Sequence, residues 1–394
     1  MTAVYIVDGV RTPVGRYGGS LSSVRPDDLA ALTVGAVVER SGVDPSAIDE
    51  VVLGAANQSG EDNRNVARMA VLLAGLPVSL PAFTVNRLCA SGMTAITTAH
   101  ALIASGAAEV MVAGGVESMS RAPWVQAKPH RAFAGPGAQF DTSIGWRFVN
   151  PHLERDDDDI TLSMPETAEL VAERFGIGRE RADDFALESH RRAIAAVDAG
   201  RFDGEIVAVD TATGPVMADE GPRRDTDAAA LARLRPVVAG GRIVTAGNAS
   251  TLNDGASAVL LASEAAVRTH GLTPRARIVA HAASALHPSI MGMGPVDAAT
   301  AALRRAGWRS EDLGAMELNE AFAAQALACR DRLEWDPALV NAWGGAIALG
   351  HPLGSSGARI VVTLLSRMVA DDVRRGAAAM CVGVGQGTAL LLER

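Results

Sequence analysis

The sequence predicts an α/β protein built from two similar halves, with a loop domain inserted between their main elements. Three observations predict this fold: short β-branched runs alternate with longer amphipathic runs, two anchor segments recur at one spacing, and a central stretch differs in composition. The 394 residues suffice for two or three domain-sized units with a buried core.

Strands and helices are predicted along both halves of the chain. Several predicted strands end at paired or clustered glycines, where the backbone must turn or approach a ligand closely. We expect strands at 4–7, 51–53, 110–113, 258–261 and 277–280, and helices at 27–41, 92–105 and 357–369.

An internal repeat has a spacing of 265 residues. Residues 42–52 resemble residues 307–317, and each segment follows a helix and leads into a strand (307 − 42 = 265). Gly92 and Gly357 open helices at the same spacing (357 − 92 = 265), and a strand with a glycine-rich end follows each helix. Two anchors rarely share an offset by chance, so we predict two similar α/β halves that face each other.

Residues 119–245 differ from both halves. They contain the only lysine, Lys128, together with many prolines and glycines, two polar helical patterns and the acidic run 156–159. We predict an inserted loop domain that lies over one half, within an N-terminal half at 1–270, followed by a C-terminal half at 271–394. The acidic run favours a solvated surface turn, with a metal site as the alternative.

Charge and composition exclude several classes of function. The 36 basic and 45 acidic residues give a net charge of −9, which argues against a nucleic-acid or anionic-membrane partner. Apolar runs are too short to span a bilayer, and the first residues lack a signal-peptide pattern. Three cysteines are too few for a disulfide framework, so we expect a cytoplasmic protein. Because Lys128 lies in a Lys-Pro loop, Schiff-base enzymes and P-loop NTPases are close to excluded.

Four candidate reactive residues lie at strand-to-helix or strand-to-turn junctions. Cys89 stands at a predicted helix start, where free N–H groups and the helix dipole stabilise a thiolate, although a small buried residue is the alternative. His351 lies in a loop rich in Gly and Pro, immediately before a helix. Asn319 ends a strand, where an N-cap is the alternative. Cys381 precedes the glycine-rich segment 383–387, which lacks the following helix of a dinucleotide site and instead brings backbone N–H groups to a ligand.

Together these motifs resemble the thiolase family over the whole chain and in the family's order. The matching segments are 89–93, 114–120, 247–250, 319–322, 350–352 and 381–383. The resemblance implies duplicated halves in a layered α-β-α-β-α arrangement. It also implies an acyltransferase that cleaves a 3-oxoacyl-CoA with CoA, reversibly and through an acyl-cysteine, to acetyl-CoA and a shortened acyl-CoA.

Within the family, the 3-oxoadipyl-CoA (β-ketoadipyl-CoA) thiolases of aromatic catabolism resemble the chain most. Segments 60–68, 144–151 and 163–169 suggest this branch, and Ser163 stands where biosynthetic acetoacetyl-CoA thiolases carry histidine. An acetyl-CoA acetyltransferase and a general 3-ketoacyl-CoA thiolase of fatty acid β-oxidation remain alternatives. A decarboxylating condensing enzyme is a further alternative, but such an enzyme would have a second histidine where this chain has Cys381, which argues against it. A non-catalytic acyl-CoA-binding protein is a remote alternative.

The resemblance implies a role for each reactive residue. Cys89 is the nucleophile, His351 helps to generate its thiolate, and Cys381 exchanges the proton at the α-carbon. The backbone N–H groups of Cys89 and Gly383 stabilise one oxyanion, while His351 and a water held by Asn319 stabilise the enolate oxygen.

The resemblance also implies the substrate contacts. Arg223 matches a position near the adenine nucleotide of CoA, and Ser250 one near the pantetheine, whereas Ala230 replaces a family serine. CoA is a substrate, and no cofactor or metal is expected. The expected partners are CoA and acyl-CoA, and the expected assembly is a homodimer or homotetramer.

Three residues depart from the family pattern. Many thiolases have glycine at Val384 and Thr251, and the 3-oxoadipyl branch usually has asparagine at Trp343, next to the His351 loop, where we expect an effect on pocket shape.

A further substrate contact is predicted from charge. A 3-oxoadipyl group ends in a carboxylate, which is costly to bury without a partner. Arg147 and Arg64 are the candidate partners, and pairing of either arginine with a protein carboxylate at an interface is the alternative.

Overall fold

One mixed sheet joins the two halves. The computed structural model describes residues 2–156 and 158–394, except for the side chains of 154–158. The acidic run predicted as a solvated turn falls largely on these excepted residues and so lies outside the described part. The strand order is β4-β3-β5-β10-β1-β11-β14-β13-β12, and β1 pairs with β11 through Tyr5 and Ile6. The strands are β1 (Val4–Arg11), β2 (Gly15–Arg16), β3 (Glu50–Gly54), β4 (Ala82–Val85), β5 (Val110–Ser118), β10 (Asn253–Ser263), β11 (Ala276–Ala285), β12 (Ala315–Leu318), β13 (Arg375–Val382) and β14 (Gln386–Glu393).

The predicted repeat is confirmed by the positions of matching elements. Strands β3 and β12 begin 265 residues apart (315 − 50), as do β5 and β13 (375 − 110). Gly42 ends α1 (Pro26–Ser41) at a φ of 70°, and Gly307 ends α9 (Gly294–Ala306) at 68°. Both glycines adopt the left-handed conformation that commonly closes a helix, which explains why this anchor recurs in the sequence.

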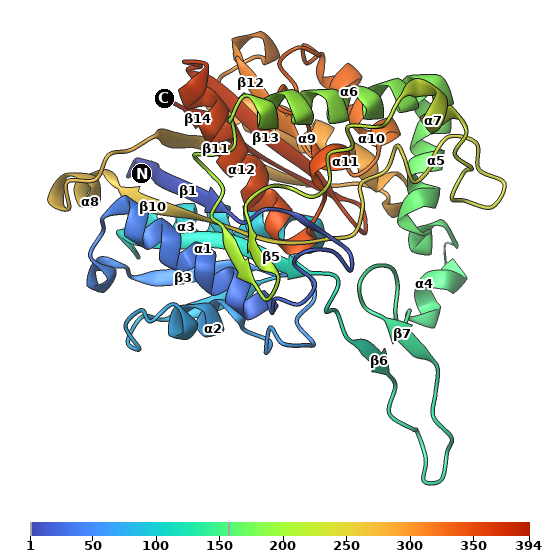
Figure 1. Ribbon diagram of the computed structural model, residues 1–394, viewed down its shortest axis with the longest axis horizontal. Helices are drawn as coiled ribbons and strands as arrows, with labels where there is room; N and C mark the ends of the chain where they lie inside the picture. The colour runs from blue at the N-terminus through green and yellow to red at the C-terminus, as the bar shows by residue number, and fades with distance from the viewer. Residues whose placement is uncertain (1, 157) are drawn as a thin grey trace.

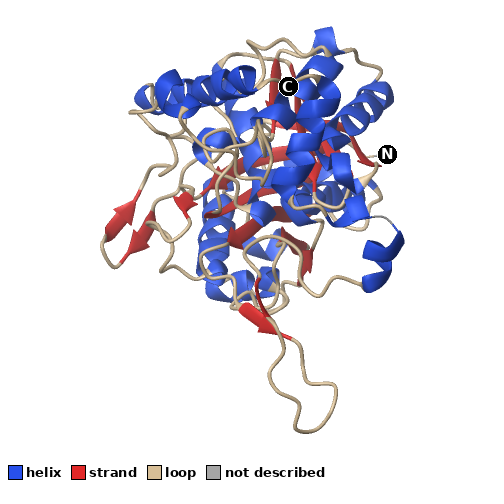
Figure 2. Cartoon of the chain, turned by 90° about the vertical axis from the view of Figure 1, so that its right-hand side faces the viewer, coloured by secondary structure: helices blue, strands red, loops and turns tan. Residues whose placement is uncertain are grey.

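The helices form layers above, between and below the two halves of the sheet (Figures 1 and 2). α3 (Ser91–Ala104) and α12 (Leu353–Ala370) share one buried cluster with both halves, whereas α1 packs in a second cluster and α9 in a third. The α-β-α-β-α arrangement is therefore confirmed. The other helices are α2 (Val66–Leu73), α4 (Pro151–Asp156), α5 (Met164–Phe175), α6 (Arg179–Asp198), α7 (Ala228–Ala232), α8 (Glu264–Thr269), α10 (Ala323–Leu333) and α11 (Ala346–Leu349).

The stretch 119–245 forms the predicted inserted region. Its helices α5 and α6 pack on the core of the second half. The paired strands β6 (Trp124–Gln126) and β7 (Gln139–Asp141) carry a long loop that projects away from the layers (Figure 1). A second small ribbon pairs β8 (Val209–Thr211) with β9 (Gly214–Val216). No helix among the described residues combines the length and the apolar character that a membrane crossing requires.

A buried ion pair anchors α12 to β12. The Arg367 guanidinium donates to Glu317 Oε1 at 2.5 Å and to the carbonyl oxygens of Met316 and Leu339, each at 2.9 Å. Arg367 and Glu317 are 2% and 1% exposed. Because α12 begins just after His351 and β12 ends just before Asn319, this pair fixes the relative position of two candidate site residues.

Arg367→Met should reduce the free energy of unfolding by about 3–5 kcal/mol, because it leaves the Glu317 carboxylate buried without its main partner. Urea unfolding at neutral pH measures the change. Arg277→Met is the matched control, since its pair with Glu393 is partly exposed and such pairs contribute about 0–1 kcal/mol. Equal losses in the two variants would contradict the anchoring role.

Candidate active site

A cavity of about 1140 Å³ opens at the carboxyl ends of strands from both halves. Cys89, Glu117, Leu353 and Gly383 come to it from the ends of β4 and β5, the start of α12 and the end of β13. The inserted region supplies most of the remaining wall. The apolar lining residues are Ala56, Leu88, Met119, Ala122, Ile144, Trp146, Met164 and Val384.

Cys89 lies in a tight turn at the start of α3, as predicted. The preceding Leu88 has a φ of 46°, and this left-handed conformation is held by Leu88 N–H donating to Asn86 Oδ1 and by Ser91 Oγ donating to the Leu88 carbonyl. Burial raises the pKa of the Cys89 thiol, although N–H groups of Gly383 and of Cys89 itself act to lower it. The prediction that the helix start favours the thiolate is therefore wrong, because desolvation outweighs the N–H groups.

Hydrogen bonds determine the tautomer of His351. Ser356 Oγ donates to the Pro352 carbonyl at 2.9 Å, so it must accept from His351 Nδ1, 2.6 Å away. The proton thus lies on Nδ1, and Nε2 is free to accept a proton. Asn253 Oδ1 accepts from the His351 backbone N–H at 2.9 Å and fixes the loop. Burial, with the charge of Arg359, lowers the pKa of His351 to about 3, so the imidazole is neutral.

Asn319 faces His351 across a short gap. Its Nδ2 lies 3.5 Å from His351 Nε2, and its Oδ1 is buried without a hydrogen-bond partner among the described residues. A buried amide oxygen without a partner is a site for an ordered water. The N-cap alternative is wrong, because the N-cap of α10 is Phe322.

Cys381 ends β13 beside Cys89 and is 1% exposed. Burial raises the pKa of its thiol well above the ordinary value, and the neighbouring Cys89 and Cys329 raise it further. Cys381 is therefore a protonated thiol at neutral pH. Gly383 follows, and its N–H interacts with Cys89, as the proposed oxyanion contact requires. Val384 has a φ of 62°, which explains why glycine is common at this position in thiolases.

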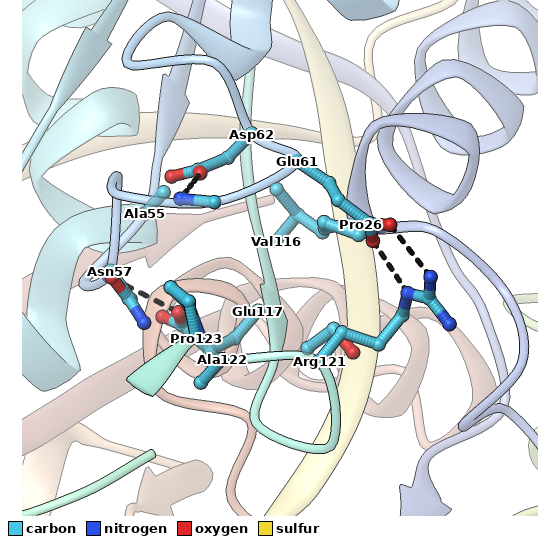
Figure 3. A pocket seen from close by; sticks show the side chains of 12 residues that line it. Pro26, Ala55, Asn57, Glu61, Asp62, Val116, Glu117, Arg121, Ala122 and Pro123 are labelled. Atoms are coloured by element: carbon cyan, nitrogen blue, oxygen red, sulfur yellow. Dashed lines mark hydrogen bonds and ion pairs between the residues drawn. The ribbon is translucent and has the colours of Figure 1, made fainter. Parts of the chain in front are cut away.

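Glu117 is a site residue to which the sequence reasoning gave no role. Its carboxylate, 4% exposed, accepts N–H groups of Ala56, Asn57 and Gly354 at 2.9–3.2 Å. Burial raises the pKa of Glu117 to about 7, despite these three donors. The sequence contained one signal for this role, namely an acidic residue at the glycine-rich end of a buried strand. Figure 3 shows Glu117 and Asn57 together beside a small adjoining cavity.

The candidate carboxylate partners Arg147 and Arg64 have different positions. Arg147 lines the cavity that contains Cys89, whereas Arg64 is exposed and does not line it. Segment 60–68 instead has structural contacts, since Glu61 binds Arg121 at 2.5 and 2.6 Å (Figure 3) and Asn65 caps α2. Arg64 is therefore a poor candidate for substrate recognition.

A second cavity of about 850 Å³ is lined by Arg223, Ala230 and Thr251. The predicted contact of Arg223 with the adenine nucleotide of CoA stays a prediction. The Ser250 hydroxyl is turned away and donates to the Ala321 carbonyl at 3.0 Å. Trp343 lines neither cavity, so the expectation that it shapes the pocket is wrong. Its ring packs edge-on against Phe202, 5.8 Å between centroids.

Comparisons with known proteins agree over the whole chain. The family model described as thiolase, N-terminal domain, matches residues 4–265, and the model described as thiolase, C-terminal domain, matches residues 272–394. The beta-ketoadipyl-CoA thiolase of Pseudomonas aeruginosa is 56% identical, with 99% of each chain covered. The 3-oxoadipyl-CoA/3-oxo-5,6-dehydrosuberyl-CoA thiolase of Escherichia coli is 49% identical, with both chains fully covered.

The fold agrees with these sequence matches. The crystal structure of human mitochondrial 3-ketoacyl-CoA thiolase in complex with CoA superposes with a TM-score of 0.92 at 38% identity, covering 100% of this chain and 98% of that one. Matches to both family models, and 56% identity across nearly the whole length of a relative, show that the chain belongs to the thiolase family of acyltransferases.

Proposed function

We propose that the chain cleaves 3-oxoadipyl-CoA with CoA to succinyl-CoA and acetyl-CoA. The observation that carries this proposal is that Cys89 and Gly383 line one cavity, where the Gly383 N–H interacts with the Cys89 thiol and the Cys381 thiol is a neighbour. The His351–Asn319 pair, with Nε2 and Nδ2 3.5 Å apart, supports it. The names of the two relatives described above support 3-oxoadipyl as the acyl group of the substrate. The largely apolar cavity favours a second candidate, a general 3-ketoacyl-CoA thiolase acting on neutral chains.

The first half-reaction begins with the transfer of the Cys89 proton to His351 Nε2. The Cys89 thiolate attacks the C3 carbonyl, and the N–H groups of Cys89 and Gly383 stabilise the oxyanion. The C2–C3 bond then breaks, which leaves the acyl group on Cys89 and the enolate of acetyl-CoA. His351 and a water on Asn319 stabilise the enolate oxygen, and the Cys381 thiol protonates the carbon.

The second half-reaction releases the acyl group. The Cys381 thiolate takes the proton of free CoA, whose sulfur attacks the thioester on Cys89 and yields the shortened acyl-CoA. Cys89 leaves as the thiolate and regains its proton from His351 Nε2. This sequence transfers only protons and an acyl group, so CoA acts as a substrate and no metal or redox cofactor is invoked. Arg223 is proposed to bind the adenine nucleotide of CoA in the second cavity, and the backbone beside Ser250 to contact the pantetheine.

The assembly and location are further parts of the proposal. The partly exposed edge strand β4 and the exposed Leu72, Leu73 and Val78 support a homodimer, or a homotetramer built from two dimers. The net charge and the few cysteines support a cytoplasmic location.

Incubation with acetyl-CoA should transfer the acetyl group to Cys89, because this thiol is half-buried and lines the cavity. Peptide mass spectrometry identifies the modified residue. Cys329→Ala should keep the label, since Cys329 is fully buried in α10 and burial raises the pKa of its thiol to about 12. Acetylation of Cys329 in place of Cys89 would overturn the assignment.

Cys381→Ser should slow carbon–carbon cleavage by about 10²–10⁴-fold, the usual contribution of a general acid–base group. Acyl exchange between acetyl-CoA and CoA should remain in part, because no α-proton moves in that half-reaction. Separate assays of the two half-reactions measure the difference. An equal loss in both would point to a collapsed site.

Ser356→Ala should lower kcat by about 10²-fold, because the Nδ1–H of His351 loses its acceptor and Nε2 is no longer held as the base. Ser355→Ala is the matched control: it removes a buried hydroxyl from the same turn, one that contacts Ser257 and not His351. Steady-state kinetics with one substrate compares them. If Ser355→Ala is as damaging as Ser356→Ala, the tautomer is not the cause.

A further inference from the structure

We infer that Arg147 binds the terminal carboxylate of a dicarboxylic 3-oxoacyl-CoA and so sets the acyl specificity; this inference rests on the proposed function. Arg147 lies in the inserted region, half-buried in the wall of the cavity that contains Cys89. Among the described residues that line this cavity, it is the only cation. An acyl group held on Cys89 therefore has one positively charged group within its own cavity.

Arg147 has no protein partner among the described residues. It forms no ion pair or hydrogen bond there, in contrast to Arg121 nearby, which is bound to Glu61. The acid of the same cavity, Glu117, is already bound by the three backbone N–H groups described above. The chain has more acidic than basic residues, 45 against 36, so an arginine without a carboxylate in a cavity wall points to a ligand.

The backbone around Arg147 is held in place while its side chain is not. Trp146 Nε1 donates to the Leu162 carbonyl at 3.3 Å, and the Phe148 ring meets Phe140 edge-on with centroids 5.0 Å apart. Phe148 has a φ of 50°, a conformation that costs energy for an aromatic residue. These flanking contacts fix the segment so that Arg147 lines the cavity without a hydrogen bond to another residue that the structure describes.

The chemistry of the cavity favours a carboxylate at Arg147. A guanidinium can bind both oxygens of a carboxylate through parallel hydrogen bonds, and such charge-assisted bonds are stronger than neutral ones. The lining is largely apolar, so a carboxylate without a partner would be costly there and a paired one is favoured. A neutral acyl chain gains nothing from the guanidinium. Arg147 therefore distinguishes dicarboxylic from neutral chains.

The test compares kcat/KM for 3-oxoadipyl-CoA with that for the neutral 3-oxohexanoyl-CoA. The two substrates have six-carbon acyl chains and differ only in the terminal group. The variants are Arg147→Met, Arg147→Lys and, as the matched control, Arg64→Met, which changes an exposed arginine outside the cavity. The full-length wild-type protein is measured in the same assay.

The wild type should prefer the dicarboxylate, and Arg147→Met should lower the ratio of the two kcat/KM values by about 10- to 100-fold. The loss should fall mainly on KM for 3-oxoadipyl-CoA, because the distal contact is similar in the ground and transition states. Arg147→Lys should lose less, since it keeps the charge without the bidentate geometry. Arg64→Met should leave the ratio at its wild-type value.

Two results would overturn the inference, and they are distinguishable. If the wild type prefers the dicarboxylate and Arg147→Met keeps the same ratio, Arg147 is not the determinant, while the proposed function stands. An equal loss with both substrates leads to the same conclusion, because it indicates a structural role. If the wild type prefers 3-oxohexanoyl-CoA, the inference and the 3-oxoadipyl function fail together.

Discussion

The buried carboxylate of Glu117 is the constraint on which the site depends. It accepts N–H groups from two segments far apart in the chain, Ala56 and Asn57 after β3 and Gly354 at the start of α12. Cys89 lies in the first half and the His351 loop in the second, so this one side chain helps to hold the two in register. Its raised pKa indicates the cost of burying the carboxylate, which the three donors offset only in part.

The duplicated topology explains why the reactive groups meet. In the first half, β3, β4 and β5 are parallel, and in the second half β12 and β13 are parallel. The carboxyl ends of the strands in each parallel set therefore lie at one edge of the sheet. Cys89 follows β4, and Asn319 and Cys381 lie at the ends of β12 and β13. Ligand sites in α/β sheets lie at the carboxyl ends of strands because loops and free backbone N–H groups gather there. Helices α3 and α12 pack against each other in one buried cluster. The carboxyl ends of strands from both halves therefore reach one cavity.

Burial favours the uncharged forms of the reactive groups. It raises the pKa values of Cys89 and Cys381 and lowers that of His351, so all three groups rest in their neutral forms. The same poorly solvated surroundings strengthen hydrogen bonds to any charge that develops during reaction. The strained backbone at Leu88 and Val384, both in the cavity wall, has an energetic cost that the surrounding packing must balance.

The sequence by itself determined the fold class and the 265-residue repeat, and it located the candidate reactive residues at strand ends, because periodicity, paired glycines and local junctions are encoded over short stretches. It also indicated Arg147, but could not separate it from Arg64. Only the tertiary structure decided that Arg147 faces the cavity, that Glu117 joins the halves, that Ser356 sets the His351 tautomer and that Trp343 packs away from the site. Each of these depends on contacts between distant segments or on the direction of a side chain. The thiolate at Cys89 was misjudged for the same reason, since a helix start is visible in the sequence and the depth of its burial is not.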